Sequence, residues 1–223
     1  MTDSLGALAG EVAACRACPR LVAWRESVAV EKVARFRHWD YWGRGVAGFG
    51  DPAAHLLIVG LAPAAHGANR TGRVFTGDRS GDFLYAALHR TGYANQPAST
   101  HVGDGLALTG AFITAAVKCA PPANKPTPAE RDRCRPFLER ELALLPAVRV
   151  VLALGQFGWD VVCSSLGARP KPRFGHGAEA ALGGGRVLLG SYHVSQQNTF
   201  TGRLTEAMLD DVLTRARHLA EKA

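Results

Sequence analysis

The loop between residues 60 and 82 holds the residue types in this sequence that are best suited to chemistry. It follows the apolar run Leu56–Val59, which is typical of a buried strand in a parallel sheet. The loop contains Asp78 and Phe75 among several arginines and glycines. Ligands bind beyond the carboxyl ends of such strands, so a long loop there is usually functional. An aspartate with an ordinary pKa of about 3.9 is ionised at neutral pH. We therefore place the chemistry here.

Two further loops should open onto the same crevice. His193 ends the apolar run 187–192, so its imidazole is expected to face the crevice that also holds Asp78. Asn124 lies in a proline-rich loop that follows the apolar run 112–117. Its amide presents a hydrogen-bond donor and an acceptor together, although such a residue can equally well only form a turn.

The cysteines have a spacing that suggests a metal site. Cys15 and Cys18 form a Cys-x2-Cys pair, and Cys119 and Cys134 form a second pair with a much wider spacing. Four thiolates can hold a zinc ion or an iron–sulfur cluster. A zinc ribbon usually has two tight pairs, so the wide spacing favours an iron–sulfur cluster. The alternative is that these are unrelated buried thiols. Cys163, in an apolar helical pattern, is interpreted as part of the core.

Apolar runs alternate with helical patterns along the chain. This alternation predicts an α/β protein with three layers, α/β/α, around a central, mainly parallel four-stranded sheet. Ser80 or Asp82 is the expected cap of the helix that follows the loop. No internal repeat is evident, so residues 1–223 are expected to form a single domain. The expected strands are 55–61, 112–117, 148–154 and 187–192, and the expected helices are 4–15, 82–91, 128–145, 156–166 and 204–220.

The composition is that of a globular protein with an excess of positive charge. Hydrophobic residues make up 47% and charged residues 20% of the 223 residues. No apolar run approaches the roughly 20 residues that span a bilayer, and the N-terminus lacks the basic and apolar regions of a signal peptide. We therefore expect a cytoplasmic protein without a membrane partner. The net charge of +7 points moderately toward a polyanionic partner.

Two separated motifs stand out in the sequence. The first is Gly60-Leu-Ala-Pro-Ala with Arg70-Thr-Gly-Arg-Val-Phe75-Thr-Gly-Asp78-Arg-Ser-Gly, and the second is His193-Val-Ser-Gln-Gln-Asn198-Thr-Phe-Thr-Gly202. They resemble the two motifs of the family 5 uracil-DNA glycosylases of bacteria and archaea. The four cysteines also match the positions that hold a [4Fe–4S] cluster in the family 4 and 5 enzymes. The resemblance extends from Cys15 to the last helix.

The resemblance implies a monofunctional DNA glycosylase of base excision repair. It would remove flipped-out uracil, and other deaminated bases, from single- and double-stranded DNA, as a cytoplasmic, nucleoid-associated monomer. Asp78 would orient water or offset positive charge on the sugar, and His193 would donate a hydrogen bond to uracil O2. The implied substrate-binding residues are Ala62, Phe75, Asn124, Ser195 and Asn198; the DNA-binding residues are Arg70, Arg73, Arg79, Gln197 and Arg203; and the cluster ligands are Cys15, Cys18, Cys119 and Cys134.

The sequence departs from the family pattern at two places. Val194 stands where many relatives have proline, which predicts a looser loop after His193. Leu61 and Ala62 provide no polar side chain where other glycosylase families place Asn, Asp or Glu. Another carboxylate must then act on the water, and Asp78 is the nearest candidate. The missing polar residue also makes a broad substrate range plausible, with hypoxanthine included.

Other interpretations stay open at this point. Asp78 could merely cap the turn that follows it. The chain could be a uracil-restricted glycosylase similar to family 4, or a catalytically silent DNA-binding module with a structural metal. A nucleotide-phosphate site is a weak alternative because no Gly-Lys-Ser/Thr follows the glycine-rich loop. The loop carries no lysine, which argues against a Schiff-base lyase.

Overall fold

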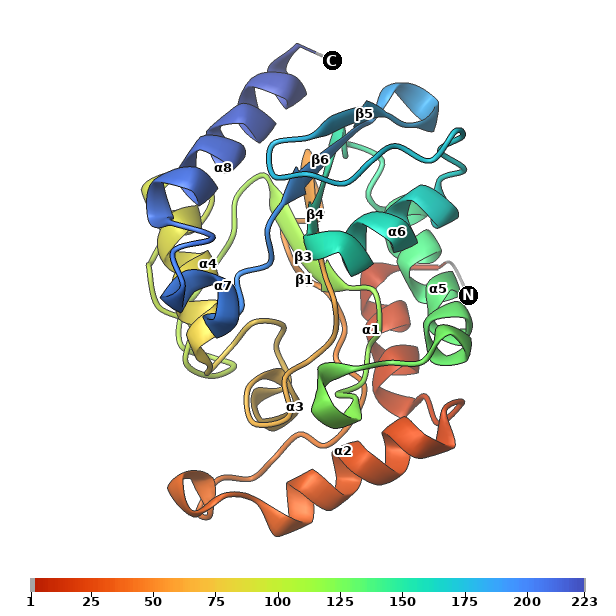
Figure 1. Ribbon diagram of the computed structural model, residues 1–223. Coiled ribbons are helices and arrows are strands. Elements are labelled where there is room, and N and C mark those ends of the chain that lie inside the picture. Colours follow the sequence, from red (N-terminus) through yellow and green to blue (C-terminus); the bar gives the residue numbers. More distant parts are fainter. Residues whose placement is uncertain (1–2, 223) are drawn as a thin grey trace.

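The computed structural model describes residues 3–222, in which a six-stranded sheet lies between two layers of helices (Figure 1). The strand order is β1-β3-β2-β4-β6-β5. The four central strands are parallel, whereas β1 and β5 pair antiparallel at the two edges. The strands are β1 (Phe49–Gly50), β2 (Leu56–Gly60), β3 (Ala111–Ala115), β4 (Val150–Leu154), β5 (Glu179–Ala181) and β6 (Val187–Ser191).

The predicted α/β fold with a mainly parallel sheet is confirmed, but the predicted number of four strands is wrong. The four central strands are the expected ones, because residues such as Leu57 and Leu152 are fully buried and leave continuous apolar runs in the sequence. The two added edge strands have two and three residues. Strands this short, and partly exposed, leave no periodic pattern that could be detected.

Helices cover both faces of the sheet (Figure 1). Helices α4 and α8 pack on one face, and α5 and α6 pack on the other, with α1 against α5. None of the helices among residues 3–222 is long and apolar enough to cross a bilayer. The helices are α1 (Leu5–Ala14), α2 (Pro19–Glu31), α3 (Ala68–Thr71), α4 (Arg79–Arg90), α5 (Pro128–Leu144), α6 (Gly155–Ser165), α7 (Gln196–Phe200) and α8 (Glu206–Glu221), with short 3-10 turns η1 (Ala34–Phe36), η2 (Pro122–Asn124) and η3 (Gly183–Gly185).

Local sequence explains where the main helices begin. Helix α5 starts with a capping box, in which Thr127 and Glu130 each bond the backbone of the other, and Pro128 occupies the first turn. Helix α4 starts three residues earlier than expected, because its cap is Asp78 and neither Ser80 nor Asp82. The Asp78 carboxylate accepts a hydrogen bond from a free backbone N–H of the first turn.

The register of the parallel strands brings distant loops together. Gly60 at the end of β2 lies beside Ala115 at the end of β3, and Leu154 of β4 lies beside Ser191 of β6. The loops that follow these strands therefore leave the sheet at one edge. Asp78, Asn124 and His193 stand on three of these loops.

Candidate active site

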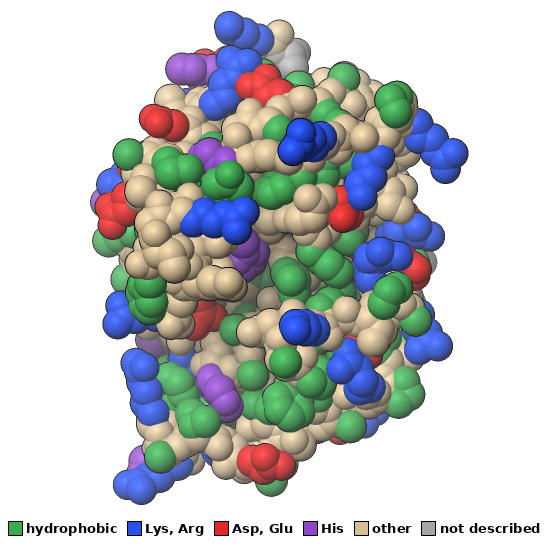
Figure 2. Space-filling model, viewed as in Figure 1, with side chains coloured by type: hydrophobic (Ala, Val, Ile, Leu, Met, Phe, Trp, Pro, Cys, Tyr) green, Lys and Arg blue, Asp and Glu red, His purple; other side chains and the backbone are tan. Residues whose placement is uncertain are grey.

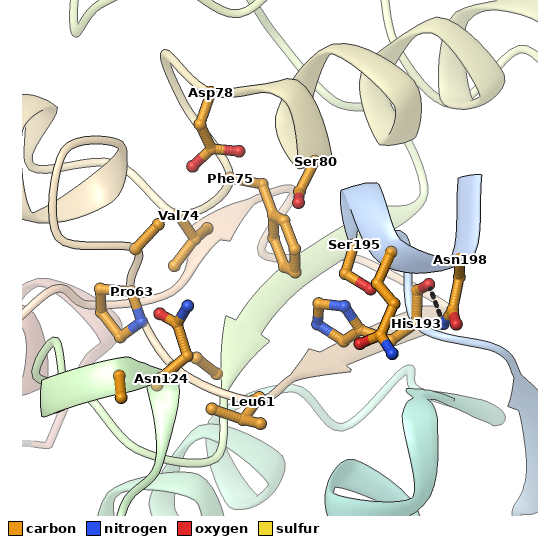
Figure 3. A pocket seen from close by; sticks show the side chains of 15 residues that line it. Leu61, Pro63, Val74, Phe75, Asp78, Ser80, Asn124, His193, Ser195 and Asn198 are labelled. Carbon is orange, nitrogen blue, oxygen red and sulfur yellow. Dashed lines mark hydrogen bonds between the residues drawn. The ribbon is translucent and has the colours of Figure 1, made fainter. Parts of the chain in front are cut away.

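A cavity of about 480 Å³ opens at the carboxyl ends of the central strands. It forms the hollow in the middle of the face shown in Figure 2, and Figure 3 shows its walls. Asp78 and His193 both line it, from loops more than a hundred residues apart in the sequence. The lining residues are Leu61, Ala62, Pro63, Ala64, Val74, Phe75, Asp78, Ser80, Ala115, Ala123, Asn124, His193, Ser195, Gln197 and Asn198.

Asp78 serves as a helix cap and as a pocket side chain at once. Its Oδ1 accepts a hydrogen bond of 3.0 Å from the backbone N–H of Gly81, and the carboxylate lies on the wall of the cavity (Figure 3). Burial raises the pKa of Asp78, while backbone N–H groups of Gly81 and Ser80 oppose that rise. A Cβ atom at Gly67 would overlap Oδ2, so any side chain there would displace the carboxylate. The capping role found here does not remove Asp78 from the cavity.

His193 occupies a second wall of the cavity and is neutral. Burial lowers the pKa of His193 to about 4, and no charge among residues 3–222 contributes to this shift. Above that pH the ring carries a single N–H, so it can donate one hydrogen bond without being a cation. The ring centroid lies 6.3 Å from that of Phe75, with 40° between the planes (Figure 3). The two rings therefore flank one volume of the pocket.

Strained backbone is concentrated at this cavity. Phe75, Ala123 and Asn124 have φ angles of 51°, 52° and 56°, in the left-handed region that L-residues rarely adopt. The ring of Phe75 packs on the backbone of Gly60, where a Cβ atom would lie 2.6 Å from a ring carbon. Strain of this kind persists only where the surroundings impose it, and it is frequent at ligand sites. The strained residues thus mark the same cavity as the polar ones.

The loop after His193 is anchored rather than free. Val194, the residue that replaces proline, is fully buried in the core. The side-chain amide of Asn198 donates a 2.8 Å hydrogen bond to the His193 carbonyl (Figure 3). Ser195 and Gln197 face the cavity from the start of α7. Burial and this hydrogen bond therefore hold the loop in place of the rigidity of a proline.

Two of the predicted DNA-contacting arginines are interior residues, which corrects the sequence-based assignment. Arg73 is 5% exposed and forms a 2.6 Å ion pair with Asp104. Arg70 is 3% exposed, and its guanidinium donates 2.8 Å hydrogen bonds to the carbonyls of His66 and Gly77. Both side chains hold the loop in shape from inside. Neither provides the exposed cation that a phosphate contact requires.

The other three predicted DNA contacts are exposed. Arg79 and Arg203 are surface residues, and Gln197 is exposed at the rim of the cavity. The Arg203 guanidinium carbon lies 4.7 Å from the centroid of the Tyr192 ring. Of the three, Gln197 lines this cavity. All three remain available for contact with a ligand.

The four cysteines of the predicted cluster line one small cavity between α2, α5 and the loop after β3. Cys119 and Cys134 are buried, and burial raises the pKa of Cys134 to about 12. The guanidinium of Arg25, itself buried, donates a 2.9 Å hydrogen bond to Cys119 Sγ. Within residues 3–222, no three His, Cys, Asp or Glu side chains converge closely enough to bind a single metal ion. Cys163 lies in the core, as predicted.

Several lining residues were missed by the sequence analysis. Pro63 belongs to the quoted Gly60-Leu-Ala-Pro signature, which was the available signal for it. Ser80 was considered only as a helix cap, yet it faces the cavity (Figure 3). The others are small or apolar residues with no chemical signal of their own: Ala64, Val74, Ala115 and Ala123.

Comparison with known proteins defines the family. A model of the uracil DNA glycosylase superfamily matches residues 47–217. This chain belongs to that superfamily and, within it, to the type-5 uracil-DNA glycosylases, which confirms the resemblance seen in the sequence. It is 58% identical to the type-5 uracil-DNA glycosylase of Mycobacterium tuberculosis, over 94% of this chain and 79% of the relative. The Mycobacterium leprae and Thermus thermophilus type-5 enzymes are 57% and 56% identical, over 97% and 93% of this chain and 96% and 94% of theirs.

Type-4 relatives are more distant. The type-4 uracil-DNA glycosylase of Pyrobaculum aerophilum is 33% identical over 130 residues, which is 58% of each chain. The type-5 enzyme of the same organism is 47% identical over 91% of this chain and 87% of the relative. The chain is therefore more similar to the type-5 enzymes than to these type-4 enzymes.

Proposed function

We propose that this chain hydrolyses the bond between uracil and deoxyribose in DNA, as the first step of base excision repair. The observation that carries the proposal is the convergence of Asp78 and His193 on one cavity large enough for a nucleobase. The glycosidic C1′–N1 bond breaks, and its electron pair leaves with the base. Water adds its oxygen to C1′ and loses a proton, and the uracil anion takes up one proton to become the neutral base. The products are free uracil and an abasic sugar.

Asp78 acts on the sugar side of this reaction. The sugar acquires positive, oxocarbenium-like charge in the transition state. A carboxylate close to C1′ therefore stabilises the transition state more than the ground state. Because Asp78 is partly buried, water screens its charge less than it would at the surface. It can also accept a hydrogen bond from the attacking water. The Leu61 and Ala62 side chains cannot replace it, because neither has a polar atom.

His193 acts on the base side. The departing uracil carries negative charge on its N1 and O2 atoms, and the neutral imidazole donates a hydrogen bond to O2. Because the pKa of His193 is about 4, the imidazole is already in this neutral donor form at neutral pH. Removal of one such donor from an active site typically costs about 10²–10³ in rate.

The remaining walls select and orient the base. Phe75 provides an aromatic surface on which the flipped base stacks. The exposed amide of Asn124 faces the cavity and can pair with a donor and an acceptor on the uracil edge. Ala62 leaves an apolar wall, Ser195 can bond the substrate through its hydroxyl, and Asn198 holds the His193 loop. This small number of polar contacts supports a range that includes hypoxanthine.

Contact with DNA outside the pocket is assigned to exposed residues near its rim. Arg79 and Arg203 are suited to phosphate groups, and Gln197 reaches the same region. Phe200 at the end of α7 is 69% exposed, which is unusual for a large aromatic side chain. We assign to it the role of a wedge that fills the gap left by the flipped base.

We also propose that Cys15, Cys18, Cys119 and Cys134 hold a [4Fe–4S] cluster. Each iron of such a cluster takes one cysteine, so the four sulfurs surround a volume and do not meet at one point. This matches four thiols around one cavity that has no single-ion geometry among the described residues. Arg25 provides a positive charge for the thiolates. The cluster would act structurally, by tying α2 to the loop that carries Asn124.

The proposal further includes a single-domain protein that works as a cytoplasmic, nucleoid-associated monomer. A catalytically silent DNA-binding module is the competing function. Incubation with single-lesion oligonucleotides, followed by alkaline cleavage on a gel, separates the two. Release of uracil from single- and double-stranded substrates is expected. Binding of DNA without release of any base would favour the silent module. Cleavage at uracil but not at inosine would restrict the substrate range to uracil.

A further inference from the structure

A second cavity, of about 250 Å³, adjoins the uracil pocket. Asp78 lines both cavities, so whatever occupies one lies next to whatever occupies the other. The walls of the second cavity include Phe36 and Trp39, which come from the segment between α2 and β1, and the buried Arg70. None of these three side chains has a role in the glycosylase proposal above.

The wall of this cavity is a fixed stack. The guanidinium carbon of Arg70 lies 3.9 Å from the ring centroid of Phe36 and 4.1 Å from that of Trp39. Backbone carbonyls of the loop hold two of the guanidinium nitrogens, but Nη1 is buried without a partner among residues 3–222. Trp39 remains 38% exposed. As a purely structural arrangement this stack is unfavourable. The buried guanidinium lacks one hydrogen-bond partner, and the indole leaves apolar surface in contact with water.

The walls of this cavity carry charges of both signs, namely the carboxylates of Asp78 and Asp82 and the guanidinium groups of Arg35, Arg70 and Arg79. The two carboxylates repel an anion placed directly beside them. Arg35 and Arg79 are exposed residues on the same walls, where they can meet a backbone phosphate outside. An aromatic platform with carboxylate acceptors beside it suits a nucleobase. A base has a π-face for the indole and N–H groups for the carboxylates.

We propose that this cavity is a subsite for the nucleobase next to the extruded uracil on the same strand, stacked on the exposed indole of Trp39. The inference rests on the proposed glycosylase function, because the neighbouring cavity is taken as the uracil pocket. Stacking on an aromatic side chain depends little on base identity. The subsite therefore strengthens binding without restricting the sequence around the lesion.

The test compares Trp39→Ala with Trp42→Ala. Trp42 is a matched control, because it is 39% exposed and lies in the same segment but lines other cavities. The substrates are single-stranded uracil oligonucleotides in which the 5′ or the 3′ neighbour of uracil keeps its base or is replaced by an abasic tetrahydrofuran. Thermal unfolding of each variant verifies the fold, and Trp39→Phe should restore binding because it keeps a platform.

With both neighbours present, Trp39→Ala should raise KM by about 5- to 150-fold, the range for loss of one base–aromatic stack. When one of the two neighbours is abasic, the KM of the wild type should rise by the same factor. On that substrate the KM of Trp39→Ala should equal that of the wild type. The kcat of Trp39→Ala should stay close to that of the wild type on all substrates. An equal loss on all substrates, an unchanged KM, or the same loss in Trp42→Ala would overturn the subsite. Fluorescence anisotropy with the same oligonucleotides detects the subsite even if no uracil is released, so that failure of the glycosylase proposal is seen separately.

Discussion

The uracil pocket and the cysteine cavity lie on either side of the same loops but are built in opposite ways. The pocket is about 480 Å³ in volume, and its backbone is strained at Phe75 and Asn124. The Asp78 and His193 side chains keep hydrogen-bonding capacity for a ligand. In the cysteine cavity, the sulfurs of Cys119 and Cys134 already accept hydrogen bonds from Arg25 and from the backbone. The comparison teaches that chemistry belongs to the first region and structural support to the second.

The two regions are connected through the backbone. Ala62 lines the pocket and also packs against the apolar cluster that contains Cys119 and Cys134. Asn124 follows Cys119 by five residues on the same loop. Damage to the cysteine cavity should therefore reach the pocket only by loosening these loops. Damage to the pocket should leave the fold intact.

The largest effect is expected for Asp78→Asn. Asparagine caps helices about as well as aspartate, so the bond to Gly81 and the fold should persist. Loss of the charge should lower kcat/KM for uracil release by about 10²–10⁴-fold. Single-turnover kinetics and thermal unfolding measure the two effects. Asp211→Asn, at an exposed carboxylate of α8 that lines neither cavity, is the control and should stay near wild type in uracil release. If Asp78→Asn cleaved like wild type, Asp78 would be only a cap.

His193→Ala should be next, with a loss of about 10²–10³-fold in kcat, because one donor to the leaving base is removed. His193→Asn, which keeps a side-chain donor on a similar scaffold, should recover part of this loss. Steady-state kinetics on single-stranded uracil DNA separates kcat from KM. A change confined to KM would mean that His193 only binds the base.

Gly67→Ala tests the placement of Asp78 without altering either catalytic side chain. The added Cβ overlaps Oδ2 of Asp78, so the carboxylate must move. Displacement by about 1 Å is expected to cost around 10²-fold in kcat. Gly10→Ala is the control, because a Cβ atom there meets no other atom within 4 Å. Equal activity of the two variants would contradict the required position of the carboxylate.

The acidic limb of the pH–rate profile should depend on Asp78. Asp78 works when ionised, and burial raises its pKa above the ordinary value. We therefore expect kcat/KM to rise with pH through that raised pKa and then to level off. The pKa of His193, about 4, keeps the imidazole neutral across the neutral range. The acidic limb should disappear in the residual activity of Asp78→Asn. Retention of the limb in that variant would assign it to another group.

The smallest effect on the chemical step is expected from the cysteine cavity. Cys134→Ser should lose iron and the brown colour and unfold at a lower temperature, while the folded fraction should keep nearly the wild-type kcat. Cys163→Ser is a matched control, since it places the same hydroxyl at another buried thiol. Iron analysis and thermal unfolding check both. Normal iron content in Cys134→Ser would contradict the assignment of this ligand.

The convergence of Asp78, Asn124 and His193 on one cavity could be predicted from the sequence for a physical reason. Asp78, Asn124 and His193 each follow a buried parallel strand, and the ends of such strands meet at one edge. The roles of Arg70 and Arg73 could not be obtained in this way. Arg73 forms an ion pair with Asp104, which lies thirty-one residues further along the chain. Arg70 packs against two aromatic rings that lie thirty or more residues before it. Spacing along the chain carries no signal for such pairings.

The edge strands and the cap show the same limit. The strands β1 and β5 exist because their neighbours offer unpaired edges, not because of any apolar pattern of their own. Asp78 is the cap of α4 because the loop before it is fixed by Arg70 and Gly67. Local propensity alone allowed Ser80 and Asp82 equally well. Tertiary contacts decided between them.

The most direct test of the account is a crystal structure of the Asp78→Asn variant with uracil-containing DNA. We expect a uracil outside the base stack, with its ring on Phe75, its O2 atom at the His193 ring and its sugar C1′ facing residue 78. A base bound elsewhere, or a sugar turned away from residue 78, would contradict the claim that these two loops act on one nucleotide.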